Sequence, residues 1–374
     1  MECLSISNNV TGRQACGSRL GSRGSFRQRQ RRAGCCLGSL WVACLLATNP
    51  RVLALALPSG LPAAMEKSLM AVKDDLEQLE RLEQYIRDGK FREVDPLLQS
   101  YLKAHPDSAR AYYDLGYALF RTRRISASVE ALAKSLQLDI NNAEAHKILG
   151  LDLSMAGKLD EARMELEQAA RLNPNSAEIH YFLGRIHYTQ NVFPLAKQEF
   201  EAAIRLDPAY MKAYDNLGLT MEGMGDDQAA LADYGKAIQL MERQGGKSEW
   251  PYLNLGAMYN RLNKPELALE YSRRALALNP KSAQAWFETG RAHMAQQDWA
   301  DAAKALENAI EIDPRFPKFH YVLSTVYRKM GKAAQSESEM TAYRKLFEQA
   351  KSQRALDPAE RPHLEVDNPQ EVKP

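Results

Sequence analysis

Cysteine is missing from most of this chain of 374 residues. All five cysteines lie near the start, at Cys3, Cys16, Cys35, Cys36 and Cys44. The remainder of the chain therefore has no disulfide or thiol chemistry of its own. This lack of cysteine fits an oxidising compartment without requiring one.

Residues 57–374 also lack the short motifs that carry common enzyme chemistry. They contain no H-E-x-x-H pair for a metal, no glycine-rich loop for a phosphate, no nucleophile elbow and no C-x-x-C. We therefore predict that the protein has no catalytic residues, binds no cofactor and is not an enzyme.

Clustered positive charge is absent outside the N-terminal segment. Residues 1–56 hold eight Arg, no Lys and one acidic residue, for a net charge of +7. Because the whole chain carries +2, the remainder carries −5. A protein that binds a phosphate backbone needs a basic stripe or patch. We therefore predict no nucleic-acid partner.

The segment 1–56 has the order of a secretory signal peptide with a long basic leader. Arginines precede an uncharged run over residues 33–50, and the small-residue sequence Ala54-Leu55-Ala56 follows. This order predicts export of a bacterial protein to the periplasm or the exterior, with cleavage after Ala56. The alternatives are an uncleaved membrane tether through residues 33–50 and an organelle transit peptide.

What the chain does have is a Leu-Gly pair at a nearly constant interval. Successive intervals are 34, 34, 34, 38, 34 and 34 residues. The pairs and their variants are Leu115-Gly116, Leu149-Gly150, Leu183-Gly184, Leu217-Gly218, Leu255-Gly256, Thr289-Gly290 and Leu323-Ser324. A fixed period of this length implies one supersecondary unit that is stacked repeatedly, each copy burying its apolar face against its neighbours.

Further positions align when each unit is numbered from six residues before its Leu-Gly pair. Positions 8, 20 and 27 are mostly small, which lets two antiparallel helices approach closely, while positions 4, 7, 11 and 24 are mostly large and fill the space between them. Position 32 is proline in four units, which ends the second helix before the next unit begins.

This pattern resembles the tetratricopeptide repeat family over about 240 residues. The resemblance implies an all-α solenoid, a right-handed superhelix of antiparallel helix pairs that binds other proteins. The seven units are 109–142, 143–176, 177–210, 211–248, 249–282, 283–316 and 317–350. A degenerate unit at 75–108 is predicted to cap the array after a linker at 57–74, and 351–374 is predicted to end the last helix and continue as a disordered tail.

Five of the seven histidines fall at two positions of the repeat. His146, His180 and His320 occupy position 4, while His187 and His293 occupy position 11. Aromatic residues hold position 4 in the other four units and position 11 in two units, so we interpret the histidines as substitutes for packing aromatics. A metal site needs three or more converging ligands, and we predict none.

In this family the concave surface is lined mainly by the first helix of each unit, at positions 2, 5, 9, 12 and 13. The chain places aromatic and arginine side chains at these positions, and such residues dominate interface energetics. The candidate peptide-binding residues are Tyr113, Tyr117, Tyr181, Arg185, Tyr188, Trp250, Phe287 and Arg291. The alternative for each aromatic ring is packing between adjacent first helices.

Position 6 carries asparagine in two adjacent units, Asn216 and Asn254. This is similar to the asparagine ladder of the O-GlcNAc transferase and kinesin light chain arrays, where amides hold a peptide backbone. An amide both donates and accepts, so it can pair with an extended chain of any sequence. The carboxylate clamp known in other members needs a set of Lys, Asn and Arg side chains over three consecutive units, and no three units supply it.

Together these observations predict a non-catalytic scaffold that binds an extended peptide or a partner helix in its concave groove. The alternative is a self-associating structural or assembly factor of the cell envelope, that is, a homo-oligomer. Fold-level resemblance carries much of this inference, because one scaffold serves unrelated assemblies.

Overall fold

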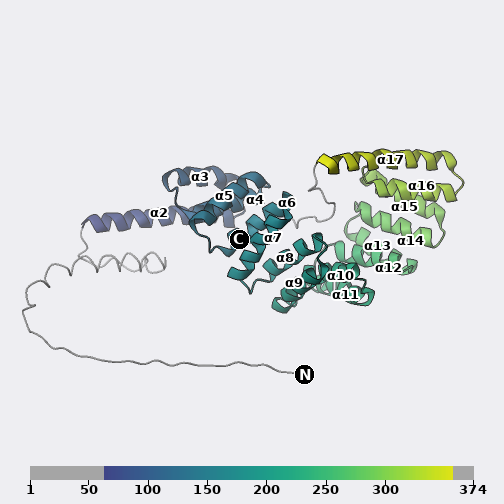
Figure 1. Ribbon diagram of the computed structural model, residues 1–374, viewed down its shortest axis with the longest axis horizontal. Coiled ribbons are helices and arrows are strands. Elements are labelled where there is room, and N and C mark those ends of the chain that lie inside the picture. Colours follow the sequence, from purple (N-terminus) through teal and green to yellow (C-terminus); the bar gives the residue numbers. More distant parts are fainter. Residues whose placement is uncertain (1–62, 357–374) are drawn as a thin grey trace, which may run out of the picture. The chain divides into compact units, whose positions relative to one another are not determined.

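The computed structural model describes residues 63–356, and the predicted signal segment 1–56 and the tail from residue 357 lie outside the described residues. Over residues 63–356 the chain forms sixteen α-helices and no strand (Figure 1). The helices are α2 (Ala63–Arg87), α3 (Phe91–Ala104), α4 (Ala109–Arg121), α5 (Ile125–Leu138), α6 (Ala143–Met155), α7 (Leu159–Leu172), α8 (Ala177–Thr189), α9 (Phe193–Leu206), α10 (Met211–Gly223), α11 (Asp227–Arg243), α12 (Trp250–Arg261), α13 (Pro265–Leu278), α14 (Ala283–Ala295), α15 (Trp299–Ile312), α16 (Pro317–Lys329) and α17 (Ala333–Leu356).

Contacts divide the chain after Glu77, inside α2, into two units, and the second unit, which begins at Gln78, holds the repeats. In this unit α4 to α17 form seven antiparallel pairs. The two helices of each pair pack against each other, and the second helix of one pair packs on the first helix of the next. The predicted all-α solenoid of helix pairs is therefore confirmed. Among the described residues no helix combines the length and the hydropathy needed to cross a bilayer.

The turn inside each pair has one conformation throughout the array. Position 15 has a positive φ, between +55° and +81°, in all seven repeats. The residue after it donates its N–H to the carbonyl of position 11 at 2.8–2.9 Å, as Lys158 does to Leu153. This is the hydrogen bond of a Schellman helix end, which satisfies a carbonyl that the helix leaves open. Gly89 has the same conformation in the degenerate unit, with φ +72°.

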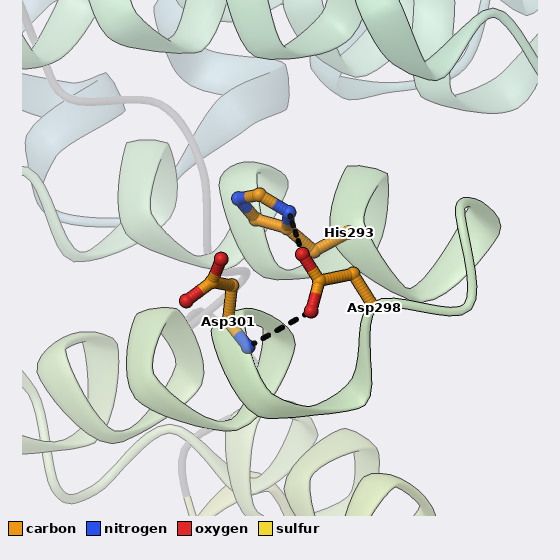
Figure 2. Close-up of side chains that lie close together, drawn as sticks. All are labelled: His293, Asp298 and Asp301. Carbon is orange, nitrogen blue, oxygen red and sulfur yellow. Dashed lines mark hydrogen bonds and ion pairs between the residues drawn. The ribbon is translucent and has the colours of Figure 1, made fainter.

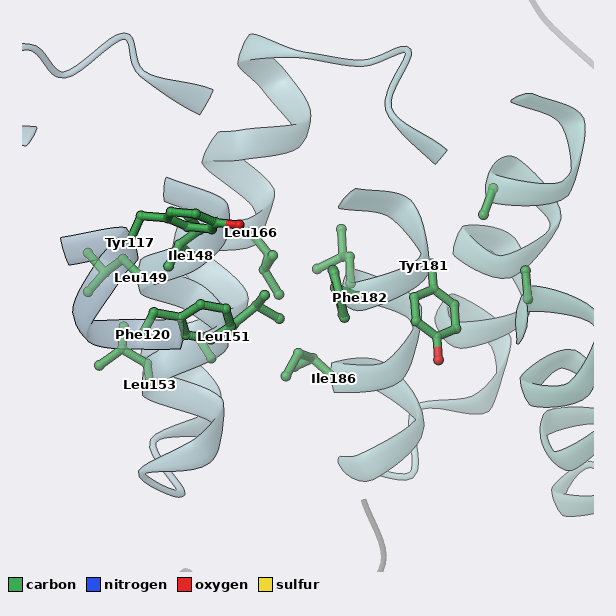
Figure 3. Packing of buried hydrophobic residues seen from close by; sticks show 14 of the residues in the cluster. Tyr117, Phe120, Ile148, Leu149, Leu151, Leu153, Leu166, Tyr181, Phe182 and Ile186 are labelled. Atoms are coloured by element: carbon green, nitrogen blue, oxygen red, sulfur yellow. The ribbon is translucent and has the colours of Figure 1, made fainter. Parts of the chain in front are cut away.

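The glycine of each Leu-Gly pair marks the closest approach of the two helices. Gly116, Gly150, Gly184, Gly218, Gly256 and Gly290 each face position 24 of the same repeat, which is a large residue in all but the fifth repeat. Position 20 is small for the same reason, and where it is serine its hydroxyl donates to the position-8 carbonyl, as Ser128 does to Gly116 at 2.8 Å. Figure 3 shows the apolar side chains that fill the space around these contacts, including Leu149 and Leu166.

In four repeats, position 4 fastens the repeat to the one before it. The Nε2 atoms of His146, His180 and His320 lie 2.9–3.1 Å from the position-32 carbonyl of the preceding repeat. Their Nδ1 atoms lie 2.6–2.7 Å from a glutamate at position 23 of their own repeat. Trp286 donates to the same kind of carbonyl, that of Pro280, at 3.0 Å. Histidine and tryptophan therefore perform the same task here, which explains why they exchange at this position.

Both partners of these histidines are acceptors, so the geometry favours a ring with two N–H groups. Burial alone would lower the pKa of His146, but the hydrogen bond to Glu165 and that to the Ile140 carbonyl together raise it above its ordinary value. The pKa of His180 is raised chiefly by its hydrogen bond to Glu199. The three rings are therefore hydrogen-bonded parts of the repeat framework.

One segment differs from the sequence prediction, and the insertion in the fourth repeat departs from the regular helix length. The predicted linker 57–74 is helical from Ala63, because the stretch that follows Pro62 is rich in good helix formers and contains no glycine or proline. The four-residue insertion of the fourth repeat mostly lengthens α11, which has 17 residues where α9 and α13 have 14. Glu242 stands where other repeats have proline, so the helix continues for nearly another turn before Gly245 ends it.

Candidate binding groove

A pocket of about 400 Å³ lies between the first helices of three consecutive repeats, α8, α10 and α12. It is lined by Tyr188, Leu219, Glu222, Asn254, Ala257 and Arg261, among others. In the repeat numbering most of these residues occupy positions 9, 12 and 13, which the family resemblance assigned to the concave surface. The helices that carry them are held at fixed spacing by the core beneath, so the pocket is preformed.

Small residues create the pocket. Gly223 occupies position 13 of its repeat, and Ala257 occupies position 9 of the next. A Cβ at Gly223 would lie 2.9 Å from the ring of Phe193, so the glycine allows that ring to pack directly beneath α10. Tyr188 packs on the same ring, with their centroids 5.7 Å apart. Leu219 and Ala257 give the hollow its apolar surface beside Tyr188.

The charged groups of the pocket neutralise one another. Glu222 accepts a hydrogen bond from the Tyr234 hydroxyl and another from Nε of Arg261, both at 3.0 Å. Arg261 also pairs with Asp227 at 2.5 Å, and this hydrogen bond is the main cause of its raised pKa. Burial raises the pKa of Tyr188, with a smaller effect from Glu222. The pocket therefore offers an apolar surface edged by hydrogen-bonding groups and carries no large net charge.

The two asparagines of the predicted ladder are half-buried, and their amide N–H groups bond within the protein. Asn254 donates from Nδ2 to both carboxylate oxygens of Asp215 at 3.0 Å. Asn216 donates from Nδ2 to the Lys212 carbonyl at 3.0 Å. Their side-chain oxygens accept no hydrogen bond among residues 63–356, so each can accept one from a peptide N–H. Only Asn254 lines the pocket.

The other predicted contact residues divide by burial. Tyr117, Tyr181 and Phe287 expose only 1%, 2% and 0% of their surface, and they pack between neighbouring first helices, as Figure 3 shows for Tyr117 and Tyr181. The structure thus places these three rings in the core rather than on the groove surface. The reason is that each ring at position 5 or 9 is covered by the next repeat, as Phe287 is by Phe319 with centroids 5.0 Å apart.

The remaining predicted side chains are held in polar or stacking contacts or are exposed. Arg185 is buried over the ring of Tyr181. Arg291 pairs with the buried carboxylate of Glu288 at 3.0 Å. Trp250 is 41% exposed, whereas Tyr113 is half-buried. Of the ten predicted residues only Tyr188 and Asn254 line the pocket.

An ion cluster joins the first helices of the second and third repeats. Lys147 exposes 1% of its surface, and its Nζ atom lies 2.6 Å from Glu144 and 2.7 Å from Glu178. Burial alone would lower the pKa of Lys147, but the two carboxylates together raise it. Removing both carboxylates would leave the buried charge of Lys147 without a partner, which is strongly unfavourable. This cluster ties the second repeat to the third.

Sequence reasoning missed Glu222, Gly223 and Arg261. Positions 12 and 13 of the fourth and fifth repeats hold these residues, and the register already assigned both positions to the concave surface. The glycine has no large side chain, so a prediction based on aromatic and arginine residues passes over it. A small residue at a groove position, next to aromatic residues in the preceding repeat, is the signal that would have located the pocket.

One group of potential metal ligands lies elsewhere, at the turn between α14 and α15 (Figure 2). His293 Nδ1 is 3.6 Å from Asp298 Oδ2, and Asp301 completes the group. Asp298 is the N-cap of α15 and accepts the backbone N–H of Asp301 at 3.4 Å. Both aspartates are exposed. Helix capping explains the placement of these carboxylates, and the group carries no metal assignment.

Comparison with known proteins agrees with this fold. Tetratricopeptide repeat models match residues 83–143, 149–210 and 259–316, residues 210–281, and residues 293–356. The chain is similar to the cytochrome c-type biogenesis protein CycH of Pseudomonas aeruginosa, with 38% identity over 80 residues, 18% of this chain and 19% of the relative. The chain thus matches about a fifth of the length of that relative.

Two solved structures share the fold. One is in the crystal structure of the APC/C hetero-tetramer Cut9–Hcn1, with a TM-score of 0.57, 19% identity, and coverage of 66% of this chain and 48% of that chain. The other is a tetratricopeptide repeat protein from Parabacteroides merdae, with a TM-score of 0.55, 14% identity, and coverage of 68% and 99%. Arrays of this kind are typically protein–protein interaction scaffolds with extended concave surfaces. The chain belongs to the tetratricopeptide repeat family.

Proposed function

We propose that this protein binds an extended peptide segment of a partner protein in the groove pocket between α8, α10 and α12. The single observation that carries the proposal is the pocket itself, which is preformed, mostly apolar and free of unbalanced charge. An apolar side chain of the peptide would fill the hollow over Leu219 and Ala257. The Tyr188 hydroxyl and the Asn254 side-chain oxygen would bond to the peptide backbone on either side.

A substitution that fills the pocket tests this proposal. Ala257→Arg places a long side chain in the hollow, and Ala232→Arg is its matched control because Ala232 is exposed on α11. Peptides are first selected from a displayed random library for binding to the full wild-type chain. We expect them to bind Ala257→Arg at least about tenfold more weakly than the wild type, because a central contact is lost. Fluorescence anisotropy with the labelled peptides gives the affinities, and unchanged affinity in Ala257→Arg would refute the pocket.

The asparagine pair gives a second prediction. The double variant Asn216→Ala with Asn254→Ala removes two side-chain oxygens that face the groove, each worth about 1 kcal/mol when bonded to a peptide. Because only Asn254 lines the pocket, one such bond is expected, and its loss should weaken binding about fivefold with unchanged helicity by circular dichroism. The single variant Asn254→Ala should therefore account for most of the effect. Equal affinity of the double variant and the wild type would end the ladder hypothesis.

Self-association is the alternative function, since a repeat array can also assemble through its ends or its outer face. A concentration-dependent mass in light scattering, with no peptide bound by the pocket, would favour it. We further propose that the protein acts after export, as the composition of residues 1–56 predicts. Fractionation of cells that express the full chain, followed by N-terminal sequencing, tests this part separately.

A further inference from the structure

The first helix of the last repeat, α16, carries an exposed basic face. Lys318, Tyr321, Arg328 and Lys329 occupy positions 2, 5, 12 and 13, the groove positions of the repeat, and all four are exposed. We call these four residues the terminal basic face. The helix, PKFHYVLSTVYRK, contains no acidic residue. It therefore presents three positive charges and one aromatic ring on a single side.

Three other groove cations are paired with carboxylates, whereas Lys318 lies over the Phe287 ring, with its Nζ atom 5.3 Å from the centroid. Lys147 bonds to Glu144, Arg261 to Glu222 and Arg291 to Glu288. No carboxylate in residues 63–356 lies within ion-pair distance of Lys318, Arg328 or Lys329. Two carboxylates of the adjoining helices are already bonded, since Glu307 accepts the Tyr327 hydroxyl and Glu339 lies against the His320 ring. The terminal basic face thus has an unbalanced charge.

The ring of Tyr321 is also uncovered. Phe287, at the same position of the preceding repeat, is fully buried beneath Phe319. The ring of Tyr321 packs on Tyr343 of α17, with centroids 5.3 Å apart, and Tyr321 is 48% exposed. In the part of the chain that the structure describes, no further repeat follows to cover it. The face therefore offers apolar area as well as charge to an occupant.

The chain contains a segment of the matching chemistry directly after α17. Residues 357–374 carry five acidic residues and two basic ones, Arg361 and Lys373, for a net charge of −3. The acidic residues are Asp357, Glu360, Glu365, Asp367 and Glu371. Leu364 and Val366 stand among them and can contact an aromatic ring. The segment 357–374 thus has the negative charge that the terminal basic face needs and apolar side chains that match the ring of Tyr321.

The segment 357–374 is long enough to reach the terminal basic face. Helix α17 has 24 residues and packs antiparallel to α16, which has 13, so α17 extends about 15 Å beyond the start of α16. An extended segment of 18 residues spans up to about 60 Å. It can return along that overhang and still cover the roughly 17 Å between Lys318 and Lys329. Because the segment is tethered, its effective concentration at the face is high.

We propose that the acidic segment 357–374 docks on the terminal basic face of its own chain, as an intramolecular occupant of the last part of the groove. An acidic partner would have to displace it, so the segment restricts what this end of the groove accepts. The docking depends on α16 alone and does not rest on the function proposed for the pocket. The association depends on charge, so salt weakens it.

Zero-length carbodiimide crosslinking of the dilute full chain tests the proposal. At about 0.01 M salt, where the screening length is about 30 Å, crosslinks from Glu365 or Glu371 to Lys318 or Lys329 should exceed those to Lys304 about fivefold. Lys304 is the control because it is exposed on α15. At about 1 M salt the excess should disappear. Equal crosslinking to Lys304 at low salt would overturn the proposal.

A substitution that keeps both crosslinking lysines completes the test. Arg328→Glu reverses one charge of the face and should reduce these crosslinks about fivefold, whereas Arg273→Glu, on the exposed side of α13, should not change them. The pocket variant Ala257→Arg should also leave them unchanged, which separates this proposal from the function proposed above. Mixing isotopically labelled with unlabelled chains identifies crosslinks between copies, and a majority of these would also overturn the proposal.

Discussion

Gly218→Ala is expected to lower the free energy of unfolding by about 2 to 3 kcal/mol, although alanine is the better helix former. A Cβ at this position would lie 2.6 Å from two ring atoms of Tyr234 and 3.1 Å from its Cγ. The ring cannot retreat easily, because it is fully buried and its hydroxyl bonds to Glu222. The two helices of the fourth repeat would have to move apart.

Gly235→Ala is the matched control, because it makes the same chemical change in α11, where an added Cβ meets nothing within 4 Å. It should raise the free energy of unfolding by about 0.5 to 1 kcal/mol through helix propensity and a less flexible unfolded chain. Urea unfolding followed by circular dichroism measures both changes. Shifts of the same sign in the two variants would contradict the interpretation of the Leu-Gly glycine as a close-contact residue.

This contrast shows why the fold could be predicted from sequence. The glycine at position 8 and the large residue at position 24 recur with the same spacing, and together they require two helices in close contact. Gly235 does not recur, and the structure gives it no packing role. Periodic recurrence therefore separates a glycine that the packing needs from one that it tolerates. The same reasoning correctly interpreted His146, His180 and His320 as parts of the framework.

The groove was harder to predict, because burial at one repeat depends on the next. Phe287 and Tyr321 occupy the same position, yet one is fully buried and the other is 48% exposed. The difference comes from Phe319, which covers Phe287 from the following repeat. Register places a side chain on the groove side of a helix, but the size and angle of its neighbours decide whether a ligand can reach it.

The start of α2 and the insertion in α11 show another limit. Both segments lie outside the strict period, so recurrence says nothing about them, and local propensity decides. Residues after Pro62 favour helix, and the replacement of proline by Glu242 removes the signal that ends the second helix elsewhere. Helix propensity, applied to these two segments alone, would have predicted the early start of α2 and the extension of α11.

Asp152 is one of two buried aspartates, with Asp114, whose raised pKa makes the stability of the fold depend on pH. It lies in α6 with no exposed surface, and neither carboxylate oxygen accepts a hydrogen bond among the described residues. Burial raises its pKa from 3.8 to about 7, against a smaller lowering effect of the neighbouring Ser128 hydroxyl. The folded protein therefore keeps this proton up to about pH 7, whereas the unfolded chain releases it near pH 4.

Between these two pH values folding takes up a proton at Asp152, so the free energy of unfolding falls as the pH rises. Asp152→Asn removes this dependence, and the free energy of unfolding of the variant relative to the wild type should rise by about 4 kcal/mol from pH 4 to pH 8. His146 and His180 titrate in both proteins, so their contributions cancel in the difference. Asp107→Asn, at an exposed site, is the control and should give a flat difference in urea unfolding over the same range. A flat difference for Asp152→Asn as well would mean that its carboxylate is ionised and stabilised in the folded protein, contrary to its burial without a hydrogen bond.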